Sequence, residues 1–129
     1  MERFVLLEKL RATDLCGWLP PEGVEMFENC FDLEAAVLPA GQVLNCAGRL
    51  GLVLSGEADC GGTIMGPGDL VGAARAPGGQ PRAVSVTVRA RRDSEIALWD
   101  GAVLTSVCYR ACWFHGRFVQ EVEKRLRRT

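Results

Sequence analysis

Residues 66–72 read Gly-Pro-Gly-Asp-Leu-Val-Gly, a candidate turn followed by two apolar residues and a further glycine. Proline restricts φ to about −65° and glycine tolerates positive φ, so this stretch predicts an abrupt turn into a short strand. Other glycine-bearing turns recur between residues 32 and 99, where they separate short apolar runs. Short strands with regularly spaced turns are typical of an antiparallel sandwich or barrel. We therefore predict a β-roll over residues 32–99.

The apolar runs of this middle region give the individual strands. One of them shows clear alternation, because Val84, Val86 and Val88 are interleaved with Ser85, Thr87 and Arg89. Such alternation indicates a strand with one face in the core and one in water. The runs predicted to be strands are residues 36–38, 50–54, 63–65, 83–88 and 96–99.

Helical periodicity flanks the roll on both sides. Residues 2–30 predict two short helices, the first burying Phe4, Leu7 and Leu10 and the second burying Val24, Phe27 and Cys30. Over residues 103–129 we predict one long C-terminal helix, with no glycine or proline stop before Thr129, which suggests that the natural polypeptide continues. The apolar stripe of this helix consists of Phe114, Phe118, Val122 and Leu126.

Length and composition indicate one globular domain over residues 1–129. The chain is 48% hydrophobic and 24% charged with a net charge of −1, which excludes a disordered, collagen-like or membrane protein. No apolar run near the N-terminus resembles a signal peptide, so we expect a cytoplasmic location and free thiols. Residues 61–129 are basic and residues 1–60 acidic; the basic C-terminal helix has two interpretations, nucleic-acid contact or, as we favour, a solvated face.

Four segments resemble the effector domain of the Crp/Fnr family of bacterial transcription regulators. Residues 66–72 resemble that family's G-P-G-D-x-F-G segment, and the four segments follow one another in the same order as in that family. The resemblance implies a mainly β fold: a double-stranded β-helix, or jelly roll, of the cyclic-nucleotide-binding type with short N-terminal helices and a long C-terminal helix. The other three segments are residues 38–44 (LPAGQVL), 52–58 (LVLSGEA) and 85–98 (SVTVRARRDSEIAL).

The same resemblance marks a ligand pocket that has lost its charges. In cyclic-nucleotide binders of this fold, a glutamate takes the ribose hydroxyl and an arginine holds the phosphate, but Ala73 and Val84 occupy those positions here. A valine cannot replace an arginine fork, so we expect no cyclic-nucleotide binding. Arg75 and Arg82 are alternative sources of charge, although solvated loop positions are the favoured interpretation. The degenerate segment comprises Gly72, Ala73, Ala74, Arg75, Arg82, Val84 and Ser85.

Catalytic and metal chemistry have little support. The chain has one histidine, His115, and lacks any Ser-His-Asp order or HExxH motif, so we predict neither an enzyme nor a cofactor. Cys108, Cys112 and His115 fall on one helical face and are weak metal or redox candidates. The favoured interpretation is two packed thiols and an imidazole bonded to a backbone carbonyl.

Our first hypothesis is the sensory and dimerisation domain of a Crp/Fnr-like regulator that responds to an unknown small molecule. The resemblance implies a homodimer through the C-terminal helix. Its stripe of Phe114, Phe118, Val122 and Leu126 has two compatible interpretations, as a cover for the roll or as part of the dimer contact. DNA would be bound only by a domain outside this chain, since no recognition helix is evident. The alternatives are a stand-alone interaction module and a thiol or metal sensor.

Overall fold

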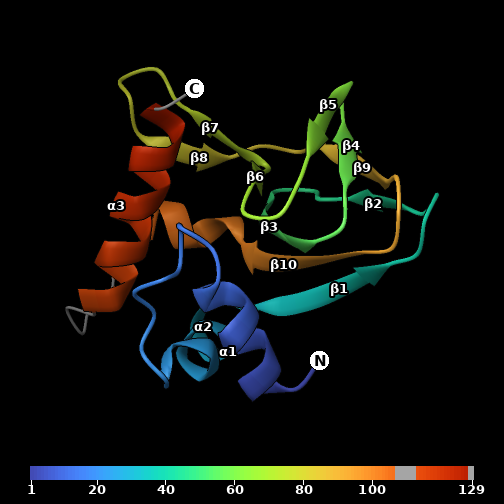
Figure 1. Ribbon diagram of the computed structural model, residues 1–129. Helices are drawn as coiled ribbons and strands as arrows, with labels where there is room; N and C mark the ends of the chain where they lie inside the picture. Colours follow the sequence, from blue (N-terminus) through green and yellow to red (C-terminus); the bar gives the residue numbers. More distant parts are fainter. Residues whose placement is uncertain (107–112, 128–129) are drawn as a thin grey trace.

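A computed structural model describes residues 1–106 and 113–127 of the chain, and its strands form three antiparallel sheets (Figure 1). Two four-stranded sheets, ordered β1-β10-β3-β6 and β2-β9-β4-β5, make the roll, and β7 pairs with β8 as a separate hairpin. The strands are β1 (Glu34–Leu38), β2 (Val43–Asn45), β3 (Arg49–Ser55), β4 (Ala58–Cys60), β5 (Thr63–Met65), β6 (Leu70–Val71), β7 (Ala73–Arg75), β8 (Pro81–Ala83), β9 (Thr87–Ala90) and β10 (Ser94–Asp100). The predicted mainly β fold is confirmed.

The turn of residues 66–69 forms as the sequence predicts. The Asp69 N–H donates to the Gly66 carbonyl at 3.0 Å, and the Gly66 N–H donates to Asp69 Oδ2 at 2.8 Å. Gly68 has φ +90 and donates to the Val53 carbonyl, while the Val53 N–H donates to the Asp69 carbonyl. These bonds lock the turn against β3 and start β6 at Leu70.

Helices α1 (Arg3–Arg11), α2 (Gly23–Phe31) and α3 (Trp113–Arg127) share one apolar core with the first sheet. At its centre, the ring of Phe27 lies 5.9 Å from that of Trp99 and 5.1 Å from those of Phe114 and Phe118. Edge-to-face aromatic pairs stabilise such a cluster beyond the area that they bury. A second core fills the roll, and it consists of Leu38, Cys46, Ala58, Val71, Val88, Ala90, Ile96 and Leu98.

Two inward positions predicted for the N-terminal helices are wrong. Phe4 is 62% exposed, because α1 packs through Leu6, Leu7 and Leu10 and turns Phe4 away from that stripe. Cys30 is exposed as well, because Phe27 in the aromatic cluster fixes which side of α2 faces the core. The periodicity located both helices but not the rotation of each about its axis.

The C-terminal helix does not run without interruption from residue 103, so this boundary is corrected. Residues Gly101–Leu104 form the 3₁₀ helix η1, whose first turn is capped by Asp100 accepting from the Ala102 N–H. The chain leaves helical geometry at Thr105, and α3 begins at Trp113 in the described residues. A Cβ at Gly101 would meet the Gly48 carbonyl and Ala83, so this tight packing holds η1 against the roll.

The predicted strand at residues 83–88 is also divided. Pro81–Ala83 forms β8 and Thr87–Ala90 forms β9, while residues 84–86 leave the sheets. Val88 is buried, but Val84 and Val86 are only half-buried. The division arises because β8 pairs with β7 and β9 pairs with β2 and β4.

Among the described residues no helix is long and apolar enough to cross a membrane.

An ion pair ties α1 to the roll. Lys9 Nζ donates to both carboxylate oxygens of Glu95, at 2.6 and 2.8 Å, and the Ser55 hydroxyl donates to Oε1 at 2.9 Å. The hydrogen bond from Lys9 is the main reason that the pKa of Glu95 is lowered, against the opposing effect of partial burial. The stability that this contact contributes is therefore pH-dependent.

Replacing Gly56 should test the turn that follows β3. Gly56 has φ +85, and an added Cβ would meet the Asp93 carbonyl and Ser94. We expect Gly56→Ala to lower the free energy of unfolding by about 2–4 kcal/mol in urea titrations. The control Gly61→Ala has φ +59 but open space, and should cost about 1 kcal/mol. Equal losses in both variants would contradict the close-approach argument.

Acid titration should report the Lys9–Glu95 contact. Because the folded-state pKa of Glu95 is depressed, its contribution is fully present above the unfolded value near 4.5 and is lost as the pH falls through the folded value. We expect Glu95→Gln to cost under about 1 kcal/mol at pH 7, a difference that shrinks as the pH falls below the unfolded value. Glu8→Gln, at an exposed position of α1, is the control and should leave the pH profile unchanged. A wild-type profile parallel to that of Glu95→Gln would refute the assignment.

Candidate functional site

The degenerate segment identified in the sequence folds as the β7–β8 hairpin. Ala73 pairs with Ala83, Ala74 with Arg82 and Arg75 with Pro81, and the Val84 N–H donates to the Gly72 carbonyl at 2.9 Å. Gly72 has φ +78, and a Cβ there would collide with the Arg49 carbonyl. Glycine at residue 72 thus allows the hairpin to leave β6 at close approach to the start of β3.

The register places the two candidate arginines on opposite faces of this hairpin. Paired residues of an antiparallel ladder share a face, and successive residues alternate between faces. Arg75 therefore lies on the face of Pro81, which borders α3, whereas Arg82 lies with Ala74 on the other face. Both arginines are exposed. Arg75 and Arg82 therefore cannot serve one phosphate from the same side of the hairpin.

The roll interior beside the hairpin offers no buried cation. Ala73 and Val84 are half-buried and Ser85 is exposed. In the described part of the chain, the buried polar side chains are Thr13, Ser94 and His115, and none is an arginine or lysine. A phosphate placed among the apolar residues of the roll would lose its hydration without gaining a charged partner.

Helix α3 is joined to the turn of residues 66–69 by an ion pair. Arg125 donates to Asp69 Oδ1 at 2.8 Å, across 56 positions of sequence, and both side chains are partly exposed. Asp69 thus holds the turn with Oδ2 and α3 with Oδ1. A movement of the turn would therefore act on the C-terminal half of the helix.

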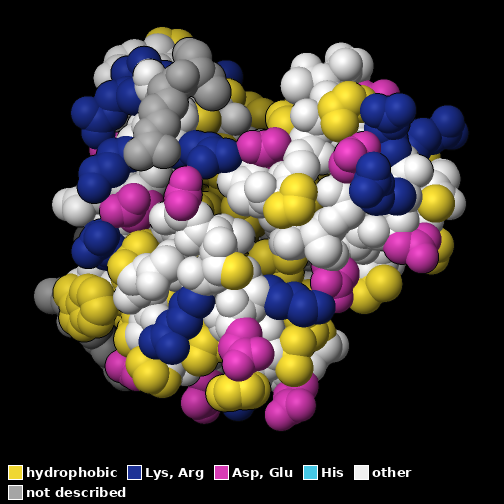
Figure 2. All heavy atoms as spheres, in the orientation of Figure 1, with side chains coloured by type: hydrophobic (Ala, Val, Ile, Leu, Met, Phe, Trp, Pro, Cys, Tyr) yellow, Lys and Arg dark blue, Asp and Glu magenta, His cyan; other side chains and the backbone are white. Residues whose placement is uncertain are grey.

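Most of the predicted dimer stripe lies inside the domain's own core. Phe114, Phe118 and Val122 are 4%, 0% and 0% exposed, and Leu126 is half-buried beside the hairpin. The stripe thus covers the roll, which is one of the two roles expected for it. The outward face is charged, and Figure 2 shows Lys and Arg side chains along α3 with Asp and Glu between them.

Charged neighbours on this outward face also hold Glu121. Partial burial alone would raise the pKa of Glu121, but hydrogen bonds from Arg117 at 2.9 Å and Lys124 at 3.3 Å outweigh it and lower the pKa.

His115 contacts a backbone carbonyl, as its favoured interpretation predicts. His115 is buried, its Nε2 lies 2.7 Å from the Val103 carbonyl oxygen, and its ring centroid is 4.8 Å from that of Phe31. Cys108 and Cys112 lie outside the described residues, so the metal hypothesis for this face is untested. Across residues 1–106 and 113–127, no group of three or more His, Cys, Asp and Glu side chains is suited to a metal.

The remaining thiols differ in their environment. Burial raises the pKa of Cys16 to about 12, against the hydrogen bond with Thr13, and also raises the pKa values of Cys46 and Cys60. Cys46 and Cys60 belong to the roll core, whereas His115 packs with Phe31 at the helical end of the molecule. A high thiol pKa disfavours the thiolate that metal binding and redox chemistry need.

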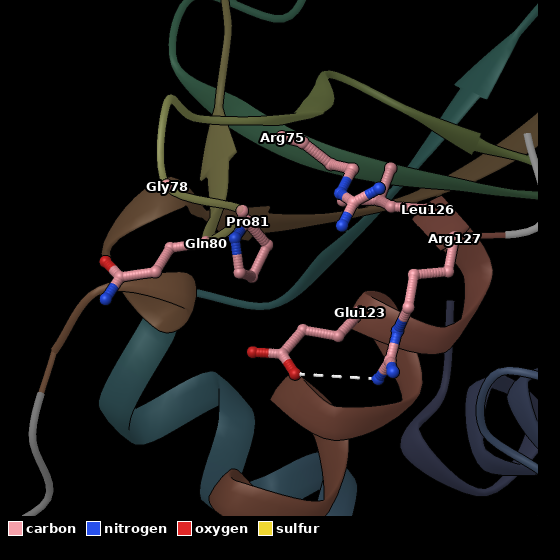
Figure 3. Close-up of a pocket in the computed structure, with 8 residues that line it drawn as sticks. Arg75, Gly78, Gln80, Pro81, Glu123, Leu126 and Arg127 are labelled. Carbon is pink, nitrogen blue, oxygen red and sulfur yellow. Dashed lines mark ion pairs between the residues drawn. The ribbon is translucent and has the colours of Figure 1, made fainter.

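A cavity that no sequence pattern indicated lies between the hairpin and α3. Its volume is about 360 Å³, and Arg75 reaches it from β7 while Glu123 and Arg127 reach it from α3 (Figure 3). The i, i+4 spacing of Glu123 and Arg127 was a visible signal, but nothing in the sequence placed this pair opposite the hairpin. The complete lining is Arg75, Gly78, Gly79, Gln80, Pro81, Glu123, Leu126 and Arg127.

Comparison with solved structures supports the fold at low sequence identity. A candidate cyclic nucleotide-binding protein from Geobacter metallireducens GS-15 aligns with a TM-score of 0.62 at 19% identity, covering 92% of each chain. The N-terminal domain of a transcriptional regulator from Streptomyces coelicolor A3(2) aligns with a TM-score of 0.57 at 17% identity, covering 93% of this chain and 91% of that one. The cyclic-nucleotide binding homology domain of a KCNH channel has a TM-score of 0.57 at 18% identity, covering 85% and 87%.

These likenesses define the fold as a jelly roll of the cyclic-nucleotide-binding type. The chain matches no protein-family model and no curated protein. The neighbours are named as binding or regulatory domains rather than as catalysts.

Removing the cation of the Asp69–Arg125 pair should loosen α3 locally. We expect Arg125→Gln to raise hydrogen exchange in the second half of α3 several-fold while β3 and β10 keep their protection. Lys124→Gln, which removes an exposed cation bonded to Glu121, is the matched control and should change exchange there less than twofold. The same change in both variants would mean that general charge, not the bond to Asp69, holds the helix.

Proposed function

We propose that this domain is the sensory and dimerisation module of a Crp/Fnr-like transcription regulator, and that its cyclic-nucleotide pocket is degenerate. The observation that carries the proposal is the contrast within the segment of residues 66–84. Its turn is closed by Asp69 and joined to α3 through Arg125, whereas Ala73 and Val84 provide no charge. A segment of this kind transmits a signal without holding a cyclic phosphate.

The output element in this proposal is α3. It is linked to the turn through Arg125 and packs on the aromatic core through Phe118. We propose that a weak homodimer forms in the cytoplasm through the outward face of α3, which presents Trp113, Gly116 and Gln120 at spacings of three and four. DNA would be contacted by a separate domain beyond residue 129. The likeness to the N-terminal domain of a transcriptional regulator supports this proposal.

A stand-alone interaction module is the second candidate, and one surface feature favours it. Trp113 is 64% exposed and stacks edge-to-face on Trp18 at 6.2 Å, while the guanidinium of Arg117 lies 5.4 Å from the Trp18 ring. Exposed tryptophan and arginine together are characteristic of protein-binding surfaces. In this alternative the partner is a protein rather than a small molecule.

Titration with cyclic AMP and cyclic GMP tests the degenerate pocket. We expect no saturable binding below about 1 mM by calorimetry, because a buried phosphate would lack a cation. Saturable binding that Arg82→Gln abolishes would contradict the proposal, because Arg82 would then provide the missing charge. Binding that only Arg75→Gln abolishes would instead place the nucleotide on the opposite face of the hairpin, beside α3.

Analytical ultracentrifugation separates the two candidates. A concentration-dependent dimer weakened by Gln120→Glu, which places like charges opposite each other in a symmetric pair, supports the regulator. A strict monomer at all concentrations favours the interaction module.

A further inference from the structure

We propose that the cavity between the β7–β8 hairpin and α3 binds a small anion through a phosphate or carboxylate group. This inference goes beyond the proposed function and does not depend on it, because the cavity lies on the face of the hairpin opposite Arg82. It gives Arg75 and Arg127 a shared role.

The cavity has the size and the accessible backbone that such a ligand requires. Its volume of about 360 Å³ lies in the range of small-molecule sites. The loop at its edge is bare, because Gly78 and Gly79 have φ +97 and +90 and carry no side chain. A Cβ at Gly78 would meet nothing within 4 Å, and one at Gly79 would meet only the guanidinium of Arg75, at 3.7 Å. A ligand can therefore reach both the loop backbone and this guanidinium.

The charges of the lining favour an anion. Arg75 forms no ion pair with any described residue, and Arg127 reaches Glu123 only at 4.0 Å. Arg75 approaches from the hairpin and the Glu123–Arg127 pair from α3 (Figure 3). Two guanidinium groups beside one carboxylate leave a net positive charge. Guanidinium groups bind phosphate and carboxylate oxygens with two parallel hydrogen bonds, and this geometry selects those groups.

The carboxylate of Glu123 competes with the proposed anion for Arg127. Its carboxylate is 39% exposed and shares Arg127 with any incoming anion. Binding would release Arg127 from Glu123 and join β7 to α3 through the ligand. Because Arg125 holds the same helical turn to Asp69, an occupied cavity would fix the C-terminal half of α3 at two points instead of one.

Nuclear magnetic resonance titration of the ¹⁵N-labelled protein tests this site, with pyrophosphate and succinate as the probes. We expect saturable shifts at the Gly78 and Gly79 amides at about 150 mM salt, where weak surface attraction is screened. Arg75→Gln and Arg127→Gln should each weaken binding about tenfold. Arg82→Gln, on the same hairpin but the opposite face, is the matched control and should change affinity less than twofold. Glu123→Gln should tighten binding.

Three results would overturn the proposal. These are the absence of saturable shifts with both probes, equal weakening by Arg82→Gln and Arg75→Gln, and weaker binding in Glu123→Gln. A response to pyrophosphate alone identifies a phosphate ligand, and a response to succinate alone identifies a carboxylate. Unchanged resonances of the β3 and β10 amides in each variant verify the fold. Cyclic AMP in the same assay reports on the roll interior separately, so failure at one site is distinguishable from failure at the other.

Discussion

Asp69 closes the turn before β6 with one carboxylate oxygen and reaches Arg125 of α3 with the other. The first bond ends the preceding loop and sets where β6 pairs with Gly51 and Leu52 of β3. The second brings the final helix against the roll, above the aromatic core around Phe27. One side chain thus couples the local geometry of a turn to the placement of an element 56 positions away.

In the hairpin between Gly72 and Val84, the alternation of side chains along paired strands places charged residues on different faces. Alternation along two paired strands sends Arg75 to the α3 side and Arg82 to the other. The hairpin therefore carries charge on both faces, although Ala73 and Val84 are uncharged. The roll interior is apolar, and a polar cleft lies beside α3.

Periodicity and turn chemistry were sufficient to predict the β-roll, its glycine turns and the flanking helices. These features depend on near neighbours in the chain: proline and glycine restrict the turn of residues 66–69, and four-residue spacing defines the stripe from Phe114 to Val122. The same local information could not fix the rotation of α1 and α2. Phe4 and Cys30 fit the periodic pattern but are exposed, because packing around Phe27 decided which side faced inward.

The sequence by itself determined that Ala73 and Val84 carry no charge and that the fold is an antiparallel roll. Three features emerge from long-range packing alone: the stripe of α3 is buried in the domain's own core, Arg75 and Arg82 lie on opposite faces of the hairpin, and Glu123 and Arg127 face that hairpin. The reason is the sequence separation over which each effect acts. Backbone preference and hydrophobic period act over a few residues, whereas the packing of α3 joins groups about fifty positions apart, and no local pattern encodes which distant surface a face will meet.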